Sequence, residues 1–149
     1  SLSMRALGID FGTKIIGIAI SDENKKIASA CASITFPKNN YLYAVNQIQK
    51  LIKRYDNSVD LIVLGYPLHI NGNKSERTFL VEKFYDLLIN NIPIKTIFWD
   101  ERYSTSKTTE MLKEFIELKS SQIKKVKDKL SAQYILQDFL NHKDENNDN

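Results

Sequence analysis

The chain has 149 residues, of which 42% are hydrophobic and 26% charged, with one cysteine and a formal net charge of +3. This length and composition are typical of one globular domain that buries its own core. Cys31 is solitary and no stretch approaches 18 uninterrupted apolar residues, so the sequence excludes an internal disulfide and a membrane-spanning helix. We therefore expect a cytoplasmic protein with no membrane partner.

The charge is unevenly distributed along the chain. The last six residues contain three acids and no base, so the remainder is more basic than the net charge indicates. Between Lys119 and Lys129, five lysines surround a single acid, Asp128. Such a run is either the solvated face of a helix or a surface that binds the phosphates of a nucleic acid.

Three segments are expected. Residues 1–3 precede Met4 and are interpreted as a leftover of cloning. Residues 4–142 carry the periodic patterns of a single folded domain. Residues 143–149 are rich in Asn, Asp and Glu, which predicts a disordered acidic tail.

The first half of the domain begins with three strand-like runs, 5–11, 15–21 and 26–36, joined by short turns. This pattern predicts an antiparallel meander. Apolar residues then recur at three- and four-residue steps over 42–55, which predicts an amphipathic helix. The solid apolar run 61–64 is typical of a strand buried on both faces.

The second half continues with a loop over 65–74 and a helical pattern around 80–88. A fifth strand is predicted over 94–99, a third helix capped by Ser104, and a last helix over 126–142. The order βββαβαβαα requires crossover connections between the later strands. We therefore expect an α/β fold whose five-stranded mixed sheet has three antiparallel strands followed by two parallel strands.

Acidic residues follow two of the predicted strands. Asp10 ends the first strand on the face of its small residues, where it either forms a turn with the next amides or belongs to a site. Asp100 and Glu101 follow the fifth strand. Because adjacent residues face opposite ways, only one of them can join Asp10, and the alternative is a strand-end ion pair with Arg102.

A third acid, Asp128, lies on the same helical stripe as Ala132, Ile135 and Phe139. It is either a capping acid favoured by the helix dipole or a carboxylate that converges with the others. Carboxylate clusters suit Mg²⁺ or Mn²⁺, and a pair of such ions can cleave a phosphodiester. Cysteine and histidine are too scattered for a zinc site.

The loop that starts at Gly65 lies at the sheet edge where open α/β folds bind ligands. Asn71, Lys74, Ser75 and Arg77 in and after this loop are candidate phosphate contacts, unless the segment is an ordinary Asn-Gly turn.

Four motifs, in order, resemble the YqgF/RuvX family: GIDFGTKIIGIAISD over 8–22, GYPL over 65–68 with Asn71-Gly72, DERYST over 100–105, and KDKLSAQYIL over 127–136. The resemblance implies an RNase H-like fold and a nuclease of structured nucleic acid. It further implies a divalent-metal site made by Asp10, Asp128 and either Glu101 or Asp100. We take Glu101 as the catalytic member, and expect the family role in 5′ maturation of precursor 16S rRNA.

The expected partner is structured RNA or branched DNA, bound by a monomer or homodimer. The predicted nucleic-acid contacts are basic or amide side chains near the acids: Lys14, Asn71, Lys74, Arg77, Arg102, Lys124, Lys125 and Lys127. Three alternatives remain: a Holliday junction resolvase, a non-catalytic binding protein of the same fold, and an ATP-binding kinase fold. The kinase alternative shares the motif over 8–13, but 149 residues leave no room for its second half.

Overall fold

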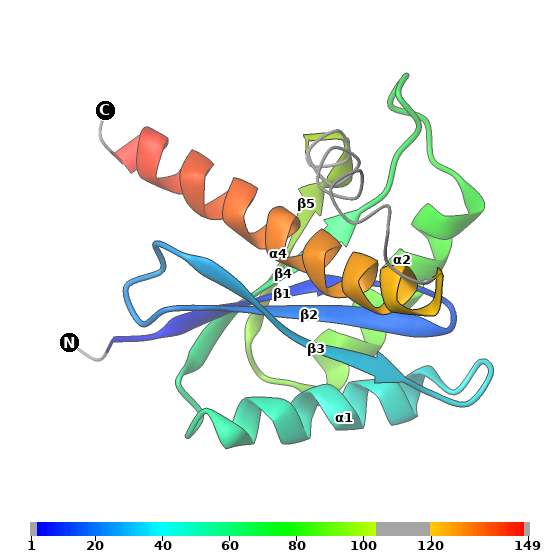
Figure 1. The fold of residues 1–149 in the computed structure, drawn as a ribbon, viewed down its shortest axis with the longest axis horizontal. Helices are drawn as coiled ribbons and strands as arrows, with labels where there is room; N and C mark the ends of the chain where they lie inside the picture. Colours follow the sequence, from blue (N-terminus) through cyan, green and yellow to red (C-terminus); the bar gives the residue numbers. More distant parts are fainter. Residues whose placement is uncertain (1–2, 104–119, 148–149) are drawn as a thin grey trace.

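The computed structural model describes residues 3–103 and 120–147 (Figure 1). Its elements follow the predicted order through the fifth strand. Within the described ranges, none of the helices has the length and apolar character needed to cross a membrane. The third helix expected after Ser104 lies outside the described residues.

One mixed sheet of five strands, in the order β3-β2-β1-β4-β5, organises the molecule. Strands β1 (Arg5–Asp10), β2 (Ile15–Ser21) and β3 (Ala28–Thr35) pair antiparallel. Strands β4 (Val59–Tyr66) and β5 (Lys95–Asp100) run parallel to β1. The predicted sheet is therefore confirmed, and its parallel strands β1, β4 and β5 end at the same edge.

Helices cover both faces of this sheet (Figure 1). On one face, α1 (Tyr41–Arg54) and α2 (Glu76–Asn91) pack against large side chains of β1, among them Leu7 and Ile9. On the other face, α4 (Ser120–Asn147) packs against small residues such as Ala6. The alternation of large and small residues along β1 thus decides which helix can approach the sheet closely.

The start of α2 is fixed by its own side chains. Ser75 and Thr78 form a capping box, in which each side chain accepts a hydrogen bond from the other's backbone N–H. The Thr78 hydroxyl also donates to the carbonyl of Pro67, in the loop that leaves β4. This double attachment holds the first turn of α2, including Arg77, beside the sheet edge.

The chain end differs from the expected tail. The last helix continues to Asn147, and Lys26 Nζ lies 3.1 Å from Asp144 Oδ1. The helix thus extends beyond residue 142, where the expected last helix ended. Extending an already packed helix adds one hydrogen bond for each residue fixed and needs no new nucleus, so polar residues continue it without an apolar stripe of their own.

Candidate active site

Two acidic residues meet at the edge where β1 and β5 end. Asp10 is the last residue of β1, and Glu101 opens the 3-10 turn η1 (Glu101–Tyr103) directly after β5. Asp10 is only 8% exposed. Its burial raises its pKa well above the ordinary value, and the charge of Glu101 and a hydrogen bond with the Glu101 side chain raise the pKa further. The two carboxyl groups are therefore in direct contact.

Arg77 supplies the positive charge between these acids. Its Nη2 donates to Asp10 Oδ1 at 3.0 Å and to the carbonyl of Phe11 at 2.8 Å, and lies 3.9 Å from Glu101 Oε1. The arginine side chain is 50% exposed, so it reaches the acids from the solvent side. Its charge opposes the upward shift in the pKa of Asp10 without cancelling it. The sequence placed Arg77 among the phosphate contacts, whereas the structure places it on the acids.

Asp128 lines a cleft together with Asp10. This cleft of about 400 Å³ is lined by Asp10, Arg77, Lys127 and Asp128, among others. Partial burial raises the pKa of Asp128, and the charge of Asp10 raises it further. In the described part of the chain, however, no three acidic, histidine or cysteine side chains are grouped tightly enough to hold a metal ion as they stand. Asp10 therefore interacts with Glu101, and it lines one cleft together with Asp128.

Two glycines make room for this arrangement. Gly17 is the β2 partner of Asp10, and a Cβ there would meet the backbone carbonyl of Asp128, with the carbonyl carbon only 2.6 Å away. A Cβ on Gly65 would lie 3.0 Å from Cδ of Glu101. Both glycines lie within the sequence motifs over 8–22 and 65–68, but neither was predicted to have a role. The available signal was a glycine inside an otherwise β-branched or apolar strand, which often marks a close approach by another backbone or side chain.

Asp100 is turned toward a different partner. Its carboxylate accepts hydrogen bonds from Arg102 Nη2 at 2.6 Å and Arg102 Nε at 2.9 Å, and from the Arg102 backbone at 3.0 Å. These bonds hold the pKa of Asp100 below its ordinary value. The structure thus puts Glu101 beside Asp10 and gives Asp100 the ion pair with Arg102 that the sequence left as the alternative.

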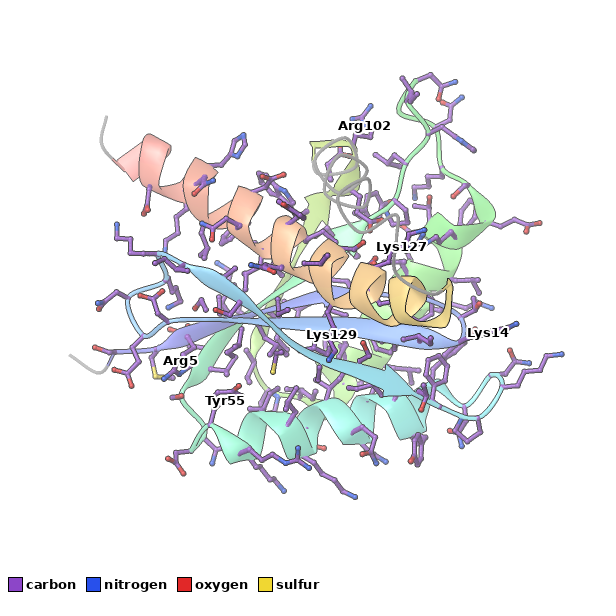
Figure 2. The ribbon with its side chains drawn as sticks, in the orientation of Figure 1. Arg5, Lys14, Tyr55, Arg102, Lys127 and Lys129 are labelled. Carbon is purple, nitrogen blue, oxygen red and sulfur yellow. The ribbon has the colours of Figure 1, made fainter. Side chains whose placement is uncertain are left out.

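The other predicted nucleic-acid contacts are dispersed around the site. Lys14 and Lys127 line a second depression of about 260 Å³ next to the cleft, and both lie toward one end of the molecule in Figure 2. Lys74 is paired with Glu82 at 2.9 Å, and Asn71 is exposed in the loop before α2. The side chains of residues 124 and 125 lie outside the described set.

Two kinds of sequence comparison match this chain to known proteins along most of its length. A family model described as "RuvX: Holliday junction resolvase" matches residues 4–142. A protein of Ureaplasma parvum serovar 3 is 42% identical, covering 92% of this chain and 96% of its own length. A protein of Caldanaerobacter subterraneus subsp. tengcongensis is 37% identical, covering 92% and 96%. Both relatives carry the name "Putative pre-16S rRNA nuclease".

The fold also has a solved counterpart. Thermus thermophilus RuvC, solved in complex with a Holliday junction substrate, aligns with a TM-score of 0.54 over 89% of this chain and 91% of its own. The sequence identity is 11%, so this likeness speaks for the fold alone. It confirms the predicted RNase H-like architecture.

Proposed function

The chain belongs to the RuvX family of nucleases, and on this premise we propose that it is a divalent-metal-dependent enzyme that hydrolyses phosphodiester bonds during 5′ maturation of precursor 16S rRNA in the cytoplasm. The names of relatives between 35% and 42% identical support this substrate. The observation that carries the metal-dependent mechanism is the contact between buried Asp10 and Glu101, in a cleft that Asp128 also lines.

The donor set at this site fits Mg²⁺ or Mn²⁺. Asp10, Glu101 and Asp128 offer only carboxylate oxygens, which these hard cations prefer. Burial is the main cause of the raised pKa values of Asp10 and Asp128, and the charge of a neighbouring carboxylate raises each further. A cation bound at these carboxylates would favour their ionised forms, which Arg77 favours only in part. We assign these three carboxylates as the metal ligands. When bound, the metal supplies Lewis-acid chemistry, polarising a phosphate and lowering the pKa of a water.

Positive side chains around the acids suit the charge of the substrate. The half-exposed guanidinium of Arg77 is the group best placed to bind oxygens of the scissile phosphate, because arginine forms paired hydrogen bonds with phosphate. Lys127 and Lys14 line the depression that continues from the cleft and would hold a neighbouring phosphate. The chain itself thus binds and orients the backbone of the nucleic acid.

Cleavage of a 5′-labelled precursor 16S rRNA in Mg²⁺, with an EDTA control, tests this function. Asp10→Asn is expected to lower the rate about 10³-fold, since the metal's contribution of several kcal/mol depends on this ligand. Asp22→Asn is the matched control, because Asp22 lies in the turn between β2 and β3, at the end of these strands away from Asp10. This variant should cleave as the wild type does. Equal rates for Asp10→Asn and wild type would refute the catalytic assignment. Binding without cleavage by the wild type would favour the non-catalytic alternative.

A second candidate substrate is a four-way DNA junction, favoured by the description of the matching family model. The same variants should be assayed on this junction in parallel. Cleavage of the junction without cleavage of the RNA would transfer the proposal to DNA resolution and leave the assigned acids unchanged. Because a four-way junction is symmetric, paired cuts would further indicate a homodimer.

A further inference from the structure

The loop between β4 and α2 is an ordered small hairpin. Leu68 and Lys74 form an antiparallel bridge at its base. Above the bridge, the His69 N–H donates to the carbonyl of Asn73 at 2.9 Å, and the Gly72 N–H donates to the carbonyl of His69 at 2.8 Å. Gly72 has a φ of +89°, a turn conformation that side chains disfavour. These bonds hold the tip of the loop in one shape.

The residue at the tip of this hairpin, Ile70, is exposed to solvent. Ile70 is 97% exposed, more than any other large hydrophobic residue that the structure describes. Burial of such a side chain stabilises a fold, and this fold leaves it exposed. Figure 1 shows the loop between β4 and α2 rising clear of the helices. Because the hairpin is bonded internally, it cannot easily turn Ile70 inward.

The hairpin is attached to the edge that carries the acids. Arg102 Nη1 donates to the carbonyl of Ile70 at 3.2 Å, while the same guanidinium binds Asp100. Glu101, the residue between them in sequence, contacts Asp10. The position of Ile70 relative to the cleft is therefore fixed through one arginine.

We propose that Ile70 is a wedge that enters between stacked bases of the substrate, at the point where paired strands separate beside the scissile phosphate. Resting on the proposed nuclease function, this names the substrate class as nucleic acid with a duplex end or branch. Apolar side chains inserted at a base step unstack it, and contacts with the nucleic-acid backbone offset the free-energy cost of unstacking. Phosphate contacts by Arg77 and Lys127 can supply that offset.

The surroundings of Ile70 favour a base step over a protein partner. Its neighbours His69 and Asn71 are exposed polar residues, so the apolar surface at the tip is confined to one side chain. A stable protein interface buries about 800 Å² on each partner, far more than one isoleucine offers. One rigid apolar side chain among polar neighbours matches the space between two bases.

The test measures base unstacking in EDTA, where no hydrolysis occurs. The fluorescent base 2-aminopurine is placed at the branch of two probes, an RNA hairpin with a single-stranded 5′ extension and a four-way DNA junction. Wild-type protein should raise the fluorescence on binding at least one probe, and the responding probe identifies the nucleic acid. Ile70→Ser should lose this rise, and Ile70→Met should restore it.

Ile27→Ser is the matched control, because Ile27 is a second exposed isoleucine, 64% exposed, in the turn between β2 and β3. It should behave as the wild type does. The proposal is overturned if Ile70→Ser unstacks the probes as well as wild type, if Ile27→Ser loses the signal equally, or if wild type leaves both probes stacked or unbound. Since no step requires cleavage, a failed nuclease assay and a failed wedge remain distinguishable.

Discussion

Two aspartates at opposite ends of the antiparallel strands show how differently one residue type is used. Asp22 follows β2, and its Oδ1 accepts hydrogen bonds from the backbone N–H groups of Ile27 at 2.9 Å and Lys26 at 2.7 Å. These bonds lower its pKa. Asp10 ends β1, is buried against Glu101, and has a pKa raised well above the ordinary value.

Asp22 therefore stabilises the fold, whereas Asp10 destabilises it when ionised. The Asp22 carboxylate is matched by donors in a solvated turn, which is the role that the sequence also left open for Asp10. At Asp10 the protein buries a carboxyl group next to a second carboxyl group, so ionising Asp10 costs stability. Perturbed acids of this kind in a cleft are typical of functional sites. Three variants test this contrast through their effects on stability.

The largest effect on stability is expected from Gly17→Ala, which fills the space between Asp10's strand partner and α4. The added Cβ collides with the backbone of Asp128, so α4 must shift. We expect a stability loss of about 1–3 kcal/mol from overpacking. Displacing Asp128 should also cut cleavage about 10²-fold in protein that is still folded. Urea unfolding and the RNA assay measure the two effects.

Ala30→Val is the control for Gly17→Ala, because it adds bulk at an exposed position of β3. It should leave both stability and cleavage nearly unchanged. If Gly17→Ala cleaves at the wild-type rate while folded, the close packing of α4 does not position Asp128 for the reaction.

An intermediate effect of opposite sign is expected from Asp10→Asn in metal-free protein. Because the folded-state pKa is raised, the wild type loses stability as pH rises from about 4 through that pKa, while the amide does not titrate. At pH 7.5 we expect Asp10→Asn to be more stable by about 1 kcal/mol, which corresponds to about 2–4 °C in Tm. The loss of the Arg77 pair reduces this gain, but burial and Glu101 outweigh it in the net shift.

Thermal unfolding in EDTA between pH 3.5 and 8 measures the Asp10→Asn effect. The difference from wild type should shrink toward the acid end, where Asp10 is protonated in both folded and unfolded chains. If the wild type is more stable than Asp10→Asn at pH 7.5 without metal, ionised Asp10 does not destabilise the fold and our interpretation is wrong.

The smallest effect is expected from Asp22→Asn. The Asp22 pKa is lowered on folding, so its contribution is present above the ordinary aspartate pKa and is lost as pH falls through the folded-state value. Because the side chain is solvated and an amide oxygen can still accept the two bonds, we expect a loss below about 1 kcal/mol at pH 7. Unfolding at several pH values from 7 downward should show this small difference shrinking as the pH falls below the ordinary aspartate pKa.

Local pattern was enough to predict most of the fold. The alternation along β1 placed Asp10 on the small-residue face, and α4 does pack on that face. The family resemblance and the nuclease class are confirmed by the comparisons. The last helix was predicted to end at residue 142, but it continues to Asn147. The polar residues of this extension have no apolar periodicity from which a helix could be predicted.

The site was predicted less completely, because its members come from distant parts of the chain. The sequence could state that only one of Asp100 and Glu101 can join Asp10, since neighbours in an extended chain face opposite ways. Which one does so depends on Arg102, which binds Asp100, and on Gly65, which leaves room for Glu101. Neither contact follows from local periodicity.

By itself, the sequence determined the order of the elements along the chain, the two faces of β1 and the three positions of the candidate acids. These depend on side-chain alternation and on motifs in neighbouring residues. The tertiary structure decided which charges meet. The packing of α2 brings Arg77 into contact with Asp10 and near Glu101. The hydrogen-bonded hairpin after β4 leaves Ile70 exposed at its tip. Such pairings depend on how α2 and the loop after β4 pack against the sheet edge, and packing between distant segments is not encoded in any local pattern.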